Sequence, residues 1–145
     1  MSNFIYLHAD DMIDKGYKIT IASNPDNIIE LENFIDGLRE SVHIGDDVYG
    51  NIIISLTEAV NNAIIHGNLC DESKEVEITA RKEGNVLSFV VADKGTGFDF
   101  DHLPDPTDPE NLEKLTGRGV FLMRQLSDKL AYSHNGSTVE MQFKL

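Results

Sequence analysis

The stretch SLTEAVNNAIIHGN, residues 55–68, is an apolar helical sequence that carries polar side chains within it. Glu58, Asn62 and His66 recur at steps of four residues, so at about 100° per residue they share one stripe roughly 80° wide. The other positions are mostly Ile, Val, Leu and Ala, which are suited to a protein core. Since a buried polar group is costly unless it is paired or used, this stripe needs an explanation.

Two interpretations of this stripe follow from the residues alone. A glutamate and an asparagine one turn apart can hold a divalent cation through oxygen and leave the carboxylate free to accept a proton. The alternative is a solvent-facing stripe that ends in a histidine, which interacts favourably with the C-terminal end of the helix dipole.

Outward from this helix, hydrophobic periodicity and turn residues divide the chain into elements. Gly84-Asn85 and Asn135-Gly136 are typical of hairpin turns, and Phe4–Leu7 is either a short strand or a docked arm. Ser23 or Asn24 is a candidate helix cap, and Pro25 suits a first turn. The expected elements are strands over 17–22, 74–81, 86–92, 129–133 and 138–143, helices over about 25–42 and 46–66, and a short buried helix over 119–126. This order predicts a single α+β domain, a two-layer sandwich with a mostly antiparallel sheet and helices on one face.

Composition excludes several classes of protein. The chain has 145 residues, a length that suits one domain with a real core, and its formal net charge of -13 disfavours nucleic acid and anionic membranes as partners. Its one cysteine, Cys70, excludes an intrachain disulfide. The sequence shows no signal peptide and no apolar run near the roughly 18 residues of a membrane span. We therefore expect a cytoplasmic protein.

A second candidate motif is VVADKGTGFD, residues 90–99, in which a buried strand ends at Asp93. A carboxylate there can accept a hydrogen bond from an amine such as that of adenine, and Gly95 and Gly97 let a ligand approach the backbone closely. A plain turn is the alternative. The stretch does not fit a dinucleotide fingerprint, because Phe100 stands where the third glycine is needed, and the chain has no phosphate-binding P-loop sequence.

A third motif is TGRGVFLMR, residues 116–124, where Gly117 and Gly119 flank Arg118 just before the expected helix. Backbone N–H groups at a helix N-terminus attract phosphate, and a guanidinium adds charge-assisted hydrogen bonds. The alternative is a flexible helix start with a solvated arginine. The preceding segment, about 99–116, is acidic and contains three of the four prolines, which is typical of a functional lid or of disorder.

Taken together, TEAVNNAIIHG, ADKGTGFD and GRGVFLMR resemble the ATP-binding fold of histidine kinases, DNA gyrase, heat-shock chaperones and mismatch-repair proteins, known as the Bergerat or GHKL superfamily. The sequence is most similar to the anti-sigma-factor serine kinases of that superfamily, over roughly residues 17–145. Residues 1–15 form an N-terminal extension of unknown role, and Lys94 places an unexpected cation beside Asp93.

The resemblance implies a role for each site residue. Glu58 would be the general base towards a substrate serine, and Asn62 would ligate Mg²⁺ that bridges the ATP phosphates. The other implied ATP contacts are Asp93 at the adenine amine, Gly95 and Gly97 beside the base, Gly117, Arg118 and Gly119 at the phosphates, and Thr138 at adenine, with Ser137 as an alternative alignment. His66 and Gly67 would be structural, and residues 99–116 would be the ATP lid.

The resemblance also implies partners. The chain would bind a sigma factor or similar regulator, phosphorylate a small anti-anti-sigma (STAS-type) protein on serine, and form a homodimer. One alternative is a nucleotide-gated binding module without significant kinase activity, although pure binding would not need Glu58 as a base. Another is a detached histidine-kinase catalytic domain, which would need a helical hairpin with a phosphorylatable histidine that the sequence lacks.

Overall fold

The computed structural model describes residues 5–6, 16–96 and 115–145, with side chains described over 16–96 and 118–145. The strands are β1 (Ile5–Tyr6), β2 (Gly16–Ala22), β3 (Glu75–Glu83), β4 (Val86–Ala92), β5 (Lys129–Ser133) and β6 (Thr138–Lys144). The helices are α1 (Ile28–Ser41), α2 (Asp46–Asn62) and α3 (Leu115–Leu126), with short helical segments η2 (Pro25–Asn27), η3 (Ala63–Gly67) and η5 (His134–Gly136).

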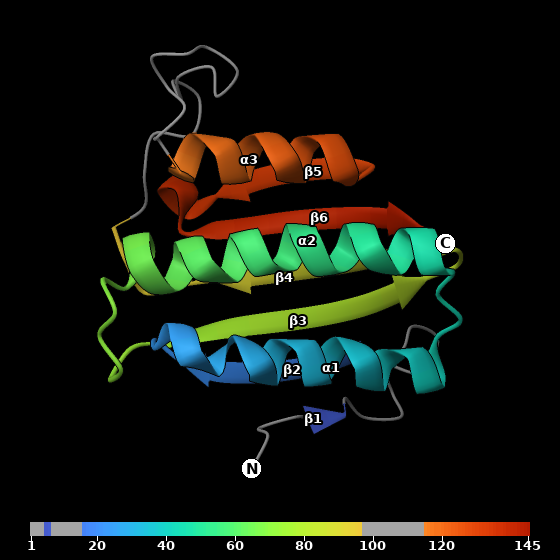
Figure 1. Ribbon diagram of the computed structural model, residues 1–145, viewed down its shortest axis with the longest axis horizontal. Helices are drawn as coiled ribbons and strands as arrows, with labels where there is room; N and C mark the ends of the chain where they lie inside the picture. The colour runs from blue at the N-terminus through green and yellow to red at the C-terminus, as the bar shows by residue number, and fades with distance from the viewer. Residues whose placement is uncertain (1–4, 7–15, 97–114) are drawn as a thin grey trace.

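The strands form one sheet in the order β1-β2-β3-β4-β6-β5, and every described pair is antiparallel. Figure 1 shows α1, α2 and α3 side by side on one face of this sheet. This arrangement confirms the predicted α+β sandwich. The expected Phe4–Leu7 segment contributes only the two-residue strand β1, which pairs with the start of β2.

The core lies between the sheet and the helices, and alternation along the strands builds it. One row of inward-facing side chains crosses the sheet through paired residues, and it consists of Ile19, Ile78, Val91, Val139 and Tyr132. The first four of these are buried and belong to the core. Against this layer α1 packs Leu31, Phe34, Ile35 and Leu38, and α2 packs Ile52, Leu56, Ala59 and Val60. Burial of this apolar surface is the main stabilising term of the fold.

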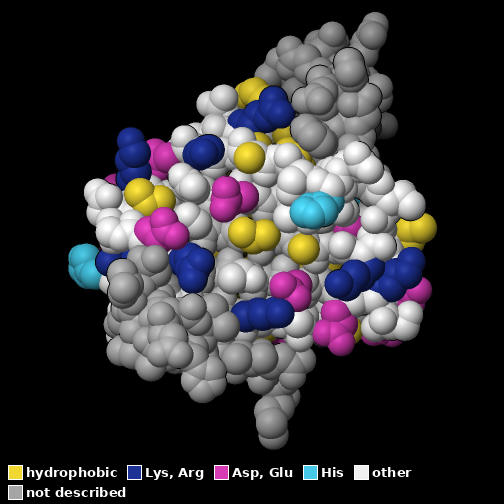
Figure 2. All heavy atoms as spheres, turned by 180° about the vertical axis from the view of Figure 1, so that it is seen from behind, with side chains coloured by type: hydrophobic (Ala, Val, Ile, Leu, Met, Phe, Trp, Pro, Cys, Tyr) yellow, Lys and Arg dark blue, Asp and Glu magenta, His cyan; other side chains and the backbone are white. Residues whose placement is uncertain are grey.

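The opposite face of the sheet is open. Side chains of both charge signs are interspersed there with small hydrophobic ones (Figure 2). One ion pair on this face joins Lys18 Nζ to Glu77 Oε2 at 3.0 Å, across the β2–β3 pairing. Such partly exposed pairs contribute little to stability, and they suit the solvent-exposed face of a sheet whose other face packs on the core.

The helices differ from the sequence expectation at their ends. The segment predicted as one helix over about 25–42 begins with the 3₁₀ turn η2, which Asn24 caps by accepting a hydrogen bond from Asp26 N–H at 3.0 Å. Helix α2 does not simply stop at Gly67, because its last turn widens into the π-helical segment η3. Such π-helical turns are often found at functional sites.

Helix α3 begins at Leu115, four residues before the predicted start at 119. Gly117 and Gly119 therefore lie inside its first turns and not ahead of it, which corrects the sequence prediction. A glycine inside a helix costs up to about 1 kcal/mol, so its presence there calls for a packing reason.

Candidate functional site

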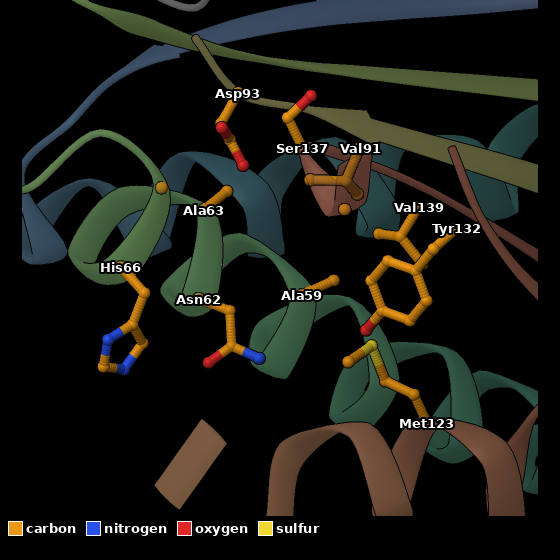
Figure 3. A pocket seen from close by; sticks show the side chains of 12 residues that line it. Ala59, Asn62, Ala63, His66, Val91, Asp93, Met123, Tyr132, Ser137 and Val139 are labelled. Carbon is orange, nitrogen blue, oxygen red and sulfur yellow. The ribbon is translucent and has the colours of Figure 1, made fainter. Parts of the chain in front are cut away.

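A pocket lies between the C-terminal half of α2, the end of β4, the start of β6 and α3. Figure 3 shows the side chains that line it. The lining residues are Ala59, Asn62, Ala63, His66 and Gly67 from α2 and η3, Val91 and Asp93 from β4 and its end, Met123 from α3, and Tyr132, Gly136, Ser137 and Val139 from the C-terminal hairpin. Mostly apolar walls with a few converging polar groups are typical of a small-molecule site.

The polar wall comes from the stripe identified in the sequence. Asn62 and His66 both line the pocket, one turn apart, and His66 is exposed at its rim. The Nδ2 atom of Asn62 is buried and has no hydrogen-bond partner in the described part of the chain. Such a group is expensive to leave unpaired, and its presence beside a pocket indicates that a ligand completes it.

Asp93 lies at one end of the pocket, just beyond β4. Its Oδ1 atom accepts a hydrogen bond from Gly95 N–H at 2.7 Å, and its own N–H donates to the Ser137 carbonyl at 2.9 Å. Desolvation raises the pKa of the Asp93 carboxyl, and the Gly95 hydrogen bond partly offsets that rise. The site thus holds a partly desolvated carboxylate whose second oxygen can accept from a ligand.

Two glycines make room for this carboxylate. A Cβ on Gly67 would lie 2.4 Å from the Asp93 carboxyl, and a Cβ on Gly95 would lie 2.1 Å from the Gly67 carbonyl oxygen. No side chain fits at either position without a shift of its neighbours. The close approach at Gly95 is to the Gly67 backbone, so the predicted contact of Gly95 with a ligand stays a prediction, and Gly97 lies outside the described residues.

A buried hydrogen-bond network supports Asp93 from behind. Lys94 N–H donates to Asn68 Oδ1 at 2.7 Å, while Asn68 Nδ2 donates to Ser23 Oγ at 2.9 Å and faces the carbonyls of Lys74 and Glu75 at 3.4 and 3.3 Å. Ser23 Oγ in turn donates to the Lys74 carbonyl. The side chain of Asn68 therefore ties the end of β4 to the end of β2 and the start of β3.

Sequence reasoning missed this network. Ser23 was a candidate helix cap and Asn68 was given no role, yet both are fully buried. The sequence held no signal for this arrangement, because Leu69 and Cys70, which follow Asn68, both adopt positive φ, an unusual conformation for such side chains. Nothing in their side-chain types predicts that conformation.

Glu58 lies beside the pocket and is not among its lining residues. Its carboxylate adjoins α3, because a Cβ on Gly119 would lie 2.9 Å from Glu58 Oε2 and 3.1 Å from Asn62 Nδ2. This contact explains a glycine inside α3, since any larger residue would press on both side chains. The structure thus brings together Glu58, Asn62 and Gly119, which the sequence placed in two separate motifs.

The far end of the pocket is apolar. In Figure 3 the Tyr132 ring and the Met123 side chain face each other across from Asp93, with Val139 close by. Burial raises the pKa of the Tyr132 hydroxyl, so this side chain is neutral over the physiological range. Sequence analysis missed Tyr132 and Met123, although the alternation of 129–133 could have placed Tyr132 on the inner face.

The remaining predicted site residues are placed as follows. Ser137 lines the pocket and Thr138 does not. Because side chains alternate along β6, Thr138 faces away from Val139, and this favours Ser137 as the residue next to a ligand. Arg118 is exposed on α3. The expected lid, 99–116, lies outside the described residues except for its last two positions, which belong to α3.

No helix in the described ranges is long and apolar enough to cross a bilayer.

Comparisons with known proteins agree with this geometry. The family profile described as histidine kinase-like ATPase domain matches residues 21–143. Serine-protein kinase RsbW from Bacillus subtilis (strain 168) is 27% identical over 131 residues, which cover 86% of this chain and 82% of the relative. Anti-sigma F factor from Clostridium perfringens (strain SM101 / Type A) is 37% identical over 101 residues, which cover 66% and 71% respectively. With the profile spanning most of the sheet, α2 and the pocket, the chain belongs to the histidine kinase-like ATPase family, in the branch of the anti-sigma-factor serine kinases.

Proposed function

We propose that this chain is a Mg-ATP-dependent serine protein kinase that also binds a sigma factor or a similar regulator. The observation that carries the proposal is that Glu58 and Asn62 both adjoin Gly119 of α3, beside a pocket whose lining includes Asn62 and Asp93. Relatives named serine-protein kinase and anti-sigma F factor support both halves of the proposal.

The pocket suits an adenine nucleotide. Family membership implies ATP binding. The free oxygen of Asp93 would accept a hydrogen bond from the exocyclic amine of adenine, and the base would lie between α2 and the apolar floor of Val91 and Val139. Ser137, which lines this end of the pocket, would take the base contact that the sequence assigned to Thr138.

Asn62 fits a magnesium ligand. Its buried Nδ2 makes no hydrogen bond to the described residues, so the amide is not held in one orientation and can turn its oxygen towards a cation. A single protein oxygen is enough where phosphates and water complete the shell, as is usual for Mg²⁺. The bound cation would neutralise charge on the phosphates during transfer.

Glu58 would act as the base. It would accept the proton of a serine hydroxyl on a protein substrate while the serine oxygen forms a bond to the γ-phosphorus of ATP. The bond between that phosphorus and the bridging oxygen breaks, and ADP leaves. Arg118, on the first turns of α3, would pair with the γ-phosphate oxygens, supported by the backbone at Gly117 and Gly119.

The partners are proposed from the family. The phosphoacceptor would be a small anti-anti-sigma protein of the STAS type, and the regulator bound in competition with it would be a sigma factor. A homodimer and a cytoplasmic location stay predictions from the sequence.

A second function is favoured by one observation. Glu58 lies outside the pocket lining and against Gly119, so in this arrangement α3 occupies part of the space around the base. A nucleotide-gated binding module without significant phosphotransfer would need no open path to Glu58.

Transfer of γ-labelled phosphate from Mg-ATP to serine-bearing anti-anti-sigma candidates of the same organism tests the proposal. We expect label on serine with the wild type and none with Glu58→Gln, while ATP binding is retained by both. Glu83→Gln, an exposed glutamate at the end of β3, is the matched control and should transfer at the wild-type rate. An unchanged rate in Glu58→Gln would contradict the role of the base. No transfer at all with intact ATP binding would favour the binding module.

A further inference from the structure

Two isoleucines are exposed on the helix that carries Glu58. Ile54 is 45% exposed and Ile65 is 41% exposed, although α2 is otherwise a core helix. Ile54 precedes Glu58 by one turn, about 6 Å along the axis, and Ile65 follows it by about 10 Å. Both side chains are therefore close to Glu58 and open to solvent.

Neither isoleucine belongs to the nucleotide pocket. The pocket is lined by Ala59, Asn62, Ala63 and His66 on this side, and Ile54 and Ile65 are not among its lining residues. The core does not use them either, since the buried residues of α2 are on its other faces. Single exposed apolar side chains are ordinary on protein surfaces, and these two matter because they lie on either side of Glu58 along the helix axis.

A protein acceptor that is centred on Glu58 would cover both Ile54 and Ile65, because protein interfaces are large. A standard interface covers about 800 Å² on each partner, which corresponds to a disc of roughly 16 Å radius. A protein substrate must bring its hydroxyl to the Glu58 carboxylate, so its footprint extends over α2 by at least the distance to Ile54 and Ile65. Helix α1 also falls within it, because packed helix axes lie about 8–10 Å apart.

The α1 side of this surface is acidic, whereas α3, on the other side of α2 (Figure 1), carries the exposed cations Arg118 and Arg124. The exposed carboxylates of α1 and of the first turn of α2 are Glu32, Asp36, Glu40, Asp46 and Asp47. The nearby cation Arg39 is already engaged, since its Nη2 lies 2.7 Å from Asp46 Oδ1 and its guanidinium stacks 4.1 Å from the centre of the Tyr49 ring. A partner that covers this area gains from basic side chains as well as apolar ones.

We propose that Ile54 on α2 and Ile65 on η3 form the docking face for the phosphoacceptor protein, which presents apolar and basic residues around its serine. This inference rests on the proposed kinase function and adds the surface that recognises the substrate. The two isoleucines would be positioning residues, because they touch the partner and not the reacting atoms.

The test compares lysine substitutions at the two exposed isoleucines with one on the opposite face of the sheet. Ile54→Lys and Ile65→Lys are measured beside Val86→Lys, which changes a partly exposed valine at the start of β4, on the sheet face away from the helices. The readouts are KM and kcat for the labelled anti-anti-sigma acceptor, the Kd for Mg-ATP, and the thermal midpoint. We expect at least a ten-fold rise in KM for the Ile54 and Ile65 variants with kcat, Kd and Tm unchanged, and wild-type values for Val86→Lys.

Ile54→Glu separates charge from loss of apolar contact. Against a basic acceptor surface, glutamate should raise KM less than lysine does at the same position. If the glutamate variant is the worse of the two, the acceptor is not basic at this point and that part of the proposal is wrong.

The remaining outcomes overturn the proposal in different ways. If wild type labels an acceptor and the Ile54 and Ile65 variants keep its KM, the docking face is wrong while the kinase stands. If the variants lower kcat or weaken ATP binding with KM unchanged, the isoleucines act inside the site. If no protein acceptor is labelled by wild type, the kinase proposal fails and the docking face fails with it.

Discussion

Asn62 and Asn68 lie on either side of the π-helical turn that ends α2, and their hydrogen-bond environments are opposite. Asn68 is fully buried and both ends of its amide are satisfied by protein groups. Asn62 has a buried nitrogen with no partner in the described part of the chain and faces a pocket. The same side chain thus serves the fold in one place and is left available for a ligand in the other. Satisfaction of polar groups distinguishes the two roles where residue type does not.

Asn68→Ala should have the largest effect on stability. It removes the acceptor of Lys94 N–H and the donor to Ser23, and leaves several buried polar groups without partners. We expect a loss of about 3 kcal/mol in the free energy of unfolding, measured by urea denaturation. Asn61→Ala, a partly exposed asparagine on α2, is the matched control and should be nearly neutral. A loss below 1 kcal/mol would show that water replaces the network.

Asn62→Ala should instead lose ligand affinity and keep the fold. It deletes a buried nitrogen that has no partner and introduces the best helix former, so the free energy of unfolding should not fall. The Kd for Mg-ATP by calorimetry should rise at least ten-fold, about 1.4 kcal/mol. The difference from wild type should shrink when Mg²⁺ is removed with EDTA. A stability loss as large as that of Asn68→Ala would erase the contrast between the two asparagines.

Gly119→Ala tests the close approach of α3 to the side chains of Glu58 and Asn62. The new Cβ would press on the ends of two flexible side chains, Glu58 Oε2 and Asn62 Nδ2, so the structural cost should be small. Displacing the base should lower the phosphotransfer rate about five-fold, roughly 1 kcal/mol in the barrier. The rate is measured at saturating ATP and acceptor, and Tm is measured in parallel. Gly37→Ala, whose Cβ would meet nothing within 4 Å, is the control and should keep the wild-type rate.

Asp93→Asn should give the smallest change, and its sign depends on pH. Burial raises the pKa of Asp93, so the folded state binds a proton at this carboxyl more tightly than the unfolded chain does. The stability that this group contributes is present below its ordinary pKa and is lost as pH rises through the raised value. The neutral asparagine should therefore raise Tm slightly at pH 7. That gain should disappear as pH falls to about 4.

The measurement for Asp93 is a pair of thermal melts of the apoprotein at the two pH values. A lower Tm at pH 7 for the asparagine variant would show that the ionised carboxylate stabilises the fold, contrary to this expectation. If the same variant binds ATP more weakly, the Asp93 carboxylate contributes to adenine binding even though it lowers the stability of the apoprotein.

Most of the fold was predictable because its signals are local. The apolar run 86–92 and the hairpin signal that includes 129–133 predicted β4 and β5 with the bounds that the structure has, and Gly84, with a φ of 60°, makes the turn that the Gly-Asn pair predicts. The polar stripe on α2 likewise placed Asn62 and His66 at the pocket. Periodicity reports which face of an element is buried, and that was enough for these features.

What could not be predicted depends on contacts between distant segments. Nothing local distinguishes Asn68 from a turn residue, because its partners are Ser23 and the backbone of β3. The choice of Ser137 over Thr138 depends on the register of β6 against β4. The fit of Gly119 against Glu58 and Asn62 is likewise a contact that no single-segment pattern contains.

The pairing of β2 with β3 has a consequence for how the chain folds. The hairpin β3–β4 closes through a tight turn, with Glu83 opposite Val86. Strand β2 instead pairs with β3 across a long connection that contains both α1 and α2, with Ile19 opposite Ile78. Closing that long loop carries an entropy cost which local hairpins avoid. We therefore expect the C-terminal hairpins to acquire amide protection first during refolding and β2 to acquire it last, so that the network around Ser23 locks the finished sheet.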